Sequence, residues 1–237
     1  MPTHLWTAAH YATRSLGRHP FFFLILQVPL LITEFVFRLS MPEIEAIKDE
    51  YTKLFYGTTL WTFFFLSSFI VQAATLATVY QLAVSPQIRV TVLFQTLAPR
   101  LPQIFSAGVI VGIAVLVGMR AFLLPGAAIF ALYLYVPDFT LLPQPVALMG
   151  LFRRSWRFAV QQNLSTLGIV AGIGFIFLLS FALDQLLAHF HEIQNGSGIR
   201  PLLWDAADLL FSLVAGMWLH TWVAHFFAAH FPERKTG

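Results

Sequence analysis

Six long apolar stretches, separated by shorter polar ones, set the pattern of the chain. They cover residues 20–39, 58–84, 103–124, 126–142, 164–188 and 202–227. A helix of about 20 apolar residues crosses a hydrocarbon core ~30 Å thick, because each residue advances the helix by ~1.5 Å. The pattern therefore predicts an all-α protein, a six-span transmembrane helical bundle that forms a single integral membrane domain over residues 1–237.

Three basic segments follow an amphipathic pattern instead, and they cover residues 3–18, 86–101 and 146–162. The last one has an apolar side and a basic side at helical spacing. The apolar side carries Met149, Phe152, Trp156 and Ala159, and the basic side carries Arg153, Arg154, Arg157 and Gln161. A basic helix with a Trp/Phe face is typical of a helix that lies in the plane of a membrane interface. We therefore expect three basic amphipathic in-plane helices on the cytoplasmic face.

The composition agrees with a membrane protein. Hydrophobic residues make up 58% of the chain and charged residues 11%, whereas about a quarter of a soluble domain is charged. There is no Cys, which excludes disulfides, thiol catalysis and thiolate metal sites. The pI is near 9.4, but the basic residues stand beside apolar spans, where the positive-inside rule accounts for them. We expect the lipid bilayer and anionic lipids as partners, and no nucleic acid.

The distribution of Lys and Arg predicts the orientation. With the N-terminus inside, nine basic residues fall inside: Arg14, Arg18, Arg89, Arg100, Arg153, Arg154, Arg157, Arg234 and Lys235. Five fall outside: Arg38, Lys48, Lys53, Arg120 and Arg200. An excess of Lys and Arg marks the cytoplasmic side. We therefore expect both termini in the cytoplasm, an acidic loop over residues 41–56 outside, and a location in the inner membrane of a bacterial type of cell.

Charged residues inside or beside the spans are few, and each needs a partner. A lone charge at the centre of a membrane helix costs ~2.5–3.5 kcal/mol on insertion scales. Arg120 is therefore expected to meet Asp184 or Asp208 through tertiary packing. Asp138 is the residue that an ion or proton path would use. A further acid, Glu34, is four residues from Arg38, and this spacing allows an ion pair on one helix face.

Small residues at a spacing of four predict close helix packing within the membrane. This spacing occurs in the third apolar stretch and again in the fifth, each with two glycines. A helix face made of small residues allows two helix backbones to approach closely. The four residues that we expect at helix contacts are Gly108, Gly112, Gly168 and Gly172.

Histidines near the C-terminus invite a metal or haem interpretation. His220, His225 and His230 are five residues apart, so each step rotates by ~140° around a helix of 3.6 residues per turn. Three such side chains do not converge on one ion, and we expect no metal and no cofactor. They are better explained as interfacial imidazoles. His220 as the single axial ligand of a tetrapyrrole, beside the small residues Ala215 and Gly216, stays open as a lesser alternative.

Four short motifs carry a resemblance to a known family. They are Pro125-Gly126, Val136-Pro137, Arg154-Ser155-Trp156 and Asn163. Over these residues the chain resembles the membrane domain attached to some bacterial glycerophosphoryl diester phosphodiesterases, and its stand-alone multi-span relatives. The resemblance implies a six-helix envelope-membrane module. The chain departs from the family pattern at Leu151-Phe152, where Ala-Leu is usual. No phosphodiesterase domain accompanies these motifs, so the resemblance does not imply hydrolytic activity.

No enzyme motif is present: there is no nucleophile elbow, no HExxH and no glycine-rich phosphate loop. We expect a non-enzymatic multi-pass membrane protein that is structural or interacts with lipids. One form of this function is an accessory subunit of a larger complex, with other integral membrane subunits as partners. The alternative from another class is a small transporter or permease-like component.

The planar guanidinium group of arginine donates paired hydrogen bonds to phosphate oxygens. The basic segments therefore predict binding of an anionic lipid headgroup, for which we name Arg153, Arg154, Arg157, Arg14 and Arg18. The competing interpretation is that these charges only set the orientation of the chain.

Overall fold

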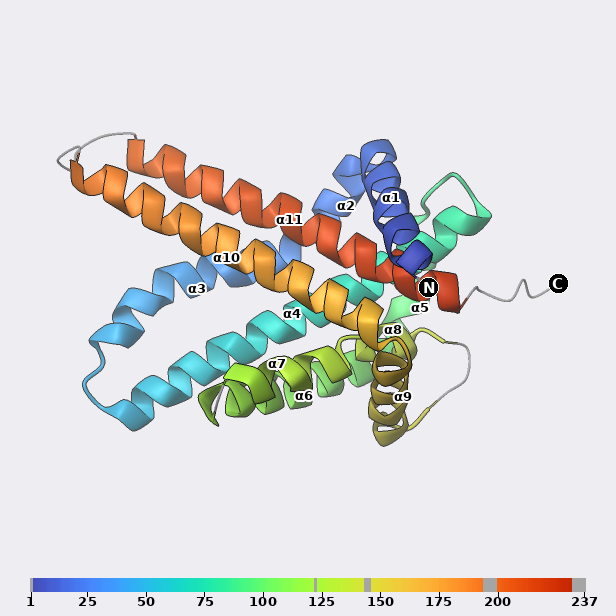
Figure 1. Cartoon of the computed structure of the whole chain (residues 1–237), viewed down its shortest axis with the longest axis horizontal. Helices are drawn as coiled ribbons and strands as arrows, with labels where there is room; N and C mark the ends of the chain where they lie inside the picture. The colour runs from blue at the N-terminus through green and yellow to red at the C-terminus, as the bar shows by residue number, and fades with distance from the viewer. Residues whose placement is uncertain (1, 122, 143–145, 194–199, 232–237) are drawn as a thin grey trace.

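The computed structural model describes residues 2–121, 123–142, 146–193 and 200–231, and within these ranges the regular structure is helical. Figure 1 shows long helices running roughly along one direction, with shorter ones crossing them near the end where both termini lie. The prediction of an all-α protein is confirmed.

α4 (Glu50–Val84) is the helix around which the others pack. It begins at Asp49, whose carboxylate accepts the backbone N–H of Thr52 at 2.8 Å and so caps the helix. The preceding helix, α3 (Val28–Ala46), is linked to α4 by only three residues, 47–49. The predicted acidic loop over 41–56 is therefore wrong in extent, because both helices continue into it.

The first predicted span is broken rather than straight. It consists of α2 (Pro20–Leu26) and α3, which are bent by 51° at Gln27. Pro29, in the first turn of α3, accounts for the break, since proline has no N–H to donate and its ring clashes with the carbonyl four residues earlier.

The second predicted in-plane segment, 86–101, is the beginning of a long helix. α5 (Val90–Leu97), a single 3-10 turn η1 (Ala98–Arg100) and α6 (Leu101–Ala121) follow one another. Together they form one membrane-length helix, Val90–Arg120. Pro99 and Pro102 tighten one turn without bending the axis strongly, because each stands where a new helical segment begins.

The predicted fourth span, 126–142, divides into α7 (Leu123–Tyr133) and α8 (Val136–Thr140). With 11 residues, α7 is only about 16 Å long at ~1.5 Å per residue, short of the ~30 Å hydrocarbon core. Pro137 is in the first turn of α8. It has no N–H to donate, and its ring clashes with a helical carbonyl four residues earlier, at Tyr133, where α7 ends. α7 folds back on α6, where a Cβ on Gly118 would lie 2.9 Å from the Gly126 backbone.

The third amphipathic segment is a separate helix, as predicted. α9 (Leu148–Gln161) meets α10 (Asn163–Ile193) at an angle of 97°. The chain returns through α11 (Arg200–His230), and α1 (Pro2–Arg18) crosses α11 (Figure 1). Ser15 and His225 hydrogen-bond at 2.9 Å, and the Trp222 indole donates to the Leu5 carbonyl at 3.1 Å.

The glycine pairs lie at helix contacts. A Cβ on Gly108 would meet Leu66 at 3.2 Å, and one on Gly112 would meet Phe65 at 3.2 Å, so α6 lies close against α4. A Cβ on Gly168 would meet Leu5 at 3.1 Å, and one on Gly172 would meet Trp222 at 3.0 Å, which sets α10 against α1 and α11.

Within the described ranges, three helices are long and apolar enough to cross a membrane, and five if each bent pair counts as one span. The three are Glu50–Val84, Val90–Arg120 and Leu209–His230; the bent pairs are α2 with α3 and α9 with the first part of α10. The chain thus has the helices of an integral membrane protein, and the predicted number of six spans is not confirmed.

Candidate functional site: a basic pocket

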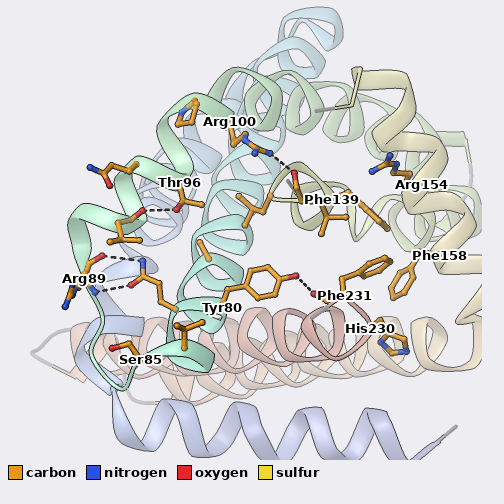
Figure 2. Close-up of a pocket in the computed structure, with 18 of the residues that line it drawn as sticks. Tyr80, Ser85, Arg89, Thr96, Arg100, Phe139, Arg154, Phe158, His230 and Phe231 are labelled. Atoms are coloured by element: carbon orange, nitrogen blue, oxygen red, sulfur yellow. Dashed lines mark hydrogen bonds between the residues drawn. The ribbon is translucent and has the colours of Figure 1, made fainter. Parts of the chain in front are cut away.

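A pocket of about 1450 Å³ opens where α4 and α11 end and where α5, α8 and α9 approach them. Figure 2 shows Arg89 on one side of it and Arg154 on the opposite side, with Tyr80 between them. Among the described residues that line the pocket, four are arginines and none is acidic: Arg89, Arg100, Arg154 and Arg157. His230 also lines it. The pocket therefore concentrates positive charge.

Arg100 lines the pocket beside the end of α8. Its guanidinium donates to the carbonyl oxygens of Thr140 and Leu142, the latter at 3.0 Å. These carbonyls belong to the end of α8, where backbone acceptors lack helical partners. A cation favours such an end, so Arg100 fastens α8 to the beginning of α6 while lining the pocket.

Arg89 is held at the mouth by a two-way contact with α4. Its backbone N–H donates to the Gln81 side-chain oxygen at 3.0 Å, and the Gln81 amide donates back to the Arg89 carbonyl at 3.4 Å. The turn between α4 and α5 is therefore fixed, and the Arg89 side chain is exposed. Nearby, the Tyr80 hydroxyl donates to the Phe231 carbonyl at 2.8 Å and joins α4 to the end of α11 (Figure 2).

α9 presents its arginines beside a face that is packed against the protein. Leu151, Ser155 and Phe158 are buried, and the Ser155 hydroxyl donates to the Leu132 carbonyl at 2.7 Å. This contact fixes the rotation of the helix, so that Arg154 and Arg157 line the pocket. Arg157 is exposed, and neither it nor the Arg89 side chain makes a hydrogen bond or ion pair within the described part of the chain.

The floor and inner wall are apolar and aromatic. Phe158 lies at the centre of a ring cluster, 4.7 Å from Tyr135 and 5.6 Å from Phe227 between centroids, and Phe139 lies 4.9 Å from Phe227. These edge-to-face contacts join α8, α9 and α11. The phenylalanines that line the pocket itself are Phe139, Phe158 and Phe231, and the aliphatic residues are Ala77, Val84, Val92, Leu141 and Leu142. A charged mouth over an apolar floor suits an amphiphilic anion.

The structure separates the five arginines predicted to bind a headgroup. Arg154 and Arg157 line the pocket, whereas Arg153 on the same helix is exposed and does not. Arg14 and Arg18 are exposed on α1 and do not line it either. Beside the pocket, the apolar side predicted for α9 is partly open, since Met149 is 79% and Trp156 49% exposed.

Sequence reasoning missed Arg89 and Arg100 as members of the site. Each was counted only as a cytoplasmic charge, because no local motif connects them to residues 154–157. Their proximity arises from α5 and α9 meeting at the same end of α4, which depends on the tertiary fold.

The polar residues predicted inside the membrane lie in different surroundings in the structure. Glu34 and Arg38 form the pair expected from their spacing, at 2.9 Å. Arg120 is exposed at the end of α6. Asp138 is fully buried and accepts the Gln72 amide at 3.0 Å. The side chains of Asp184 and Asp208, the expected partners of Arg120, lie outside the described residues.

His220 is engaged at both ring nitrogens. Nε2 is 3.2 Å from the Ser68 hydroxyl, and Nδ1 is 2.8 Å from the Gly216 carbonyl. Both ring nitrogens therefore have hydrogen-bond partners within the protein. Among the described residues, no group of three or more His, Cys, Asp and Glu side chains is arranged to hold a metal ion.

Comparison of the chain with protein-family models, with curated proteins and with solved structures gave no match. The functional conclusion therefore rests on the geometry of the basic pocket.

Proposed function

We propose that this protein binds the phosphate-bearing headgroup of an anionic lipid in the basic pocket, as a non-enzymatic multi-pass membrane protein. The observation that carries the proposal is the set of four arginines, without an acid among the described lining residues, above an apolar floor.

The chemistry of the lining favours phosphate over other anions. A guanidinium presents several N–H donors in one plane and binds phosphate oxygens in pairs. Each basic residue near a membrane surface attracts anionic lipid by ~1 kcal/mol, and the partly enclosed pocket reduces screening by salt. The apolar wall between Val84, Val92 and Phe139 accepts the first carbons of the lipid chains.

The proposed orientation places this pocket on the cytoplasmic side of a bacterial inner membrane, with both termini in the cytoplasm. The Lys and Arg distribution supports it. The angle of 97° between α9 and α10 supports an in-plane α9, and its exposed Met149 and Trp156 suit the boundary between headgroups and acyl chains.

A lipid-binding role agrees with the resemblance to the membrane domain of glycerophosphoryl diester phosphodiesterases, whose substrates carry the same phosphodiester chemistry. An accessory subunit that holds a lipid for a partner is the form of the function that we favour.

Transport is the second candidate, and a specific observation favours it. Partly buried polar side chains pair between helices: Thr33 with Ser67 at 2.7 Å, and Ser68 with His220 at 3.2 Å. Such pairs hold helices together, and they are also what a polar path requires. The pigment-binding alternative is weaker, because both nitrogens of His220 are engaged.

Native mass spectrometry of the purified protein tests the headgroup site. We expect adducts of phosphatidylglycerol on the wild type, and a loss of at least tenfold in their occupancy with Arg154→Gln combined with Arg157→Gln. The control is Arg153→Gln combined with Arg18→Gln, which removes the same charge outside the pocket and should retain the adducts.

Two further ligands separate the possible sources of the phosphate. Phosphatidylcholine should give few adducts, since its headgroup has no net charge. Soluble glycerol phosphate should compete only weakly if the acyl chains contribute. Equal loss of adducts in the pocket variant and in the control would contradict the proposal and leave the arginines as topology signals. Strong competition by glycerol phosphate would assign the pocket to a soluble phosphate compound.

A further inference from the structure

Asp138 lies beneath the floor of the basic pocket and is not part of it. Its side chain is 0% exposed, whereas its neighbours Phe139 and Leu141 line the pocket. One carboxyl oxygen, Oδ1, accepts the Gln72 amide at 3.0 Å, and the other, Oδ2, has no hydrogen-bond partner among the described residues. The helices α4 and α8 thus enclose a carboxyl group of which one oxygen accepts a hydrogen bond and the other does not.

No cation compensates a charge at this position. The elements packed against α8 are α4, α6 and α9. Lys53 near the beginning of α4 and Arg120 at the end of α6 are distant along their helices from this contact, and Arg153 on α9 is exposed. The cations near α8 are therefore Arg154 and Arg157 on α9 and Arg100 on η1. Arg100 is directed to the Thr140 and Leu142 carbonyls, and the two α9 arginines line the pocket. The other titratable groups nearby are Tyr135, whose hydroxyl pairs with Thr166 at 3.2 Å, and His230 on α11. Within the described residues, the only ion pair is Glu34 with Arg38.

An ionised carboxylate in such surroundings is costly, since transfer of an unpaired charge into a protein interior costs far more than transfer of a neutral acid. A metal ion does not resolve this cost, because the nearest polar partner, the Gln72 amide, presents N–H donors that would repel a cation. A proton does resolve it. Bound to Oδ2, it neutralises the group without further ligands.

We infer that Asp138 and Gln72 form a buried proton-binding site: α8 packs with the Asp138 carboxyl protonated at neutral pH. The proton comes from water and forms an O–H bond at Oδ2, and its release leaves a carboxylate that only the Gln72 amide stabilises. Since Phe139 and Leu141 flank this group, the site connects the protonation of one carboxyl to the packing of the pocket floor.

Infrared spectroscopy of the purified protein at neutral pH tests the inference, because a protonated carboxyl has a C=O stretching band that a carboxylate lacks. We expect this band in the wild type, with the small shift in D2O that exchange of the acid proton produces. Asp138→Asn should abolish it. Asp49→Asn is the matched control and should leave it unchanged, since Thr52 lowers the pKa of the exposed Asp49 by hydrogen bonding.

A second variant keeps the test decisive if Asp138→Asn does not fold. Gln72→Leu removes the hydrogen bond to Oδ1, so the band should move to higher frequency, as expected of a free acid carbonyl. A wild-type spectrum without the band would overturn the inference. So would a band that persists in Asp138→Asn or that stays in place in Gln72→Leu, because the proton would then belong to another acid.

Discussion

The two halves of α4 differ in their surroundings. In the first half, Tyr51 is 84%, Phe55 68% and Phe63 53% exposed. In the second half, every residue from Val71 to Val79 is buried. The first half is rich in large aromatic side chains, whereas the buried stretch from Val71 to Val79 consists of Val, Leu, Ala, Thr and one Gln. Side-chain size therefore distinguishes the exposed part of this apolar helix from the part enclosed by protein.

The largest expected difference is between two phenylalanines on this helix. Phe69 is 4% exposed and Phe55 is 68% exposed. Phe69→Ala should cost about 3–5 kcal/mol, the range for a large side chain removed from a packed core, whereas Phe55→Ala should cost little, because lipid or detergent fills the space. Thermal melts in one detergent compare the two variants. Equal losses would mean that both halves are enclosed in the same way.

Two glycines test the same comparison, because a substitution there adds a side chain instead of removing one. A Cβ on Gly112 would lie 3.2 Å from the Phe65 Cβ, whereas one on Gly57 would meet nothing within 4 Å. Gly112→Leu should therefore cost about 1–3 kcal/mol by overpacking the contact of α6 with α4. Gly57→Leu should be neutral or stabilising, since glycine is a poor helix former. A Gly112→Leu protein that melts with the wild type would contradict the close contact.

The two ends of α4 should also lie on opposite sides of the membrane. The chain has no Cys, so single cysteines report position without background. Lys48→Cys, before α4, should react with an impermeant thiol reagent in intact cells, and Gln87→Cys, after α4, should react only in opened cells. Both residues are exposed. The reverse pattern would invert the topology and place the basic pocket outside.

The smallest expected effect concerns the beginning of α4. The hydrogen bonds from Thr52 lower the pKa of Asp49 below its ordinary value. A lowered folded-state pKa contributes stability that is present above the unfolded value and is lost as the pH falls through the folded value. Asp49→Asn should therefore lower the melting temperature slightly at pH 6 and less at pH 3. An equal effect at both pH values would assign the contribution to the cap geometry alone.

The sequence was sufficient for the long helices and for the break between α9 and α10, because these follow from apolar runs and one amphipathic period. It was insufficient where proline acts within an apolar run. Pro29 bends the first span, and Pro137 divides the fourth, although the apolar pattern continues through both. The opposite error occurs at Pro99 and Pro102. Residues 86–101 were expected to form a separate in-plane helix, but the helix there continues into α6.

The basic pocket was only partly foreseeable for a related reason. Arg154 and Arg157 belong to a local amphipathic pattern, so their joint role was accessible from sequence. Arg89 precedes α5 and Arg100 belongs to η1. Only the packing of α5, α8 and α9 at one end of α4 brings them near Arg154 and Arg157. The buried state of Asp138 likewise depends on Gln72, 66 positions away along the chain.

Photo-crosslinking with a diazirine-bearing phosphatidylglycerol tests the headgroup site most directly, because it reports where the lipid binds. In bilayers of otherwise zwitterionic lipid, we expect the label, placed near the headgroup, to concentrate on peptides from α5, α9 and the second half of α4. The aromatic first half of α4 should carry only diffuse labelling. Arg154→Gln combined with Arg157→Gln should reduce the concentrated label at least tenfold. Labelling spread evenly over the exposed apolar helices, or centred on Arg14 and Arg18 in α1, would contradict the account.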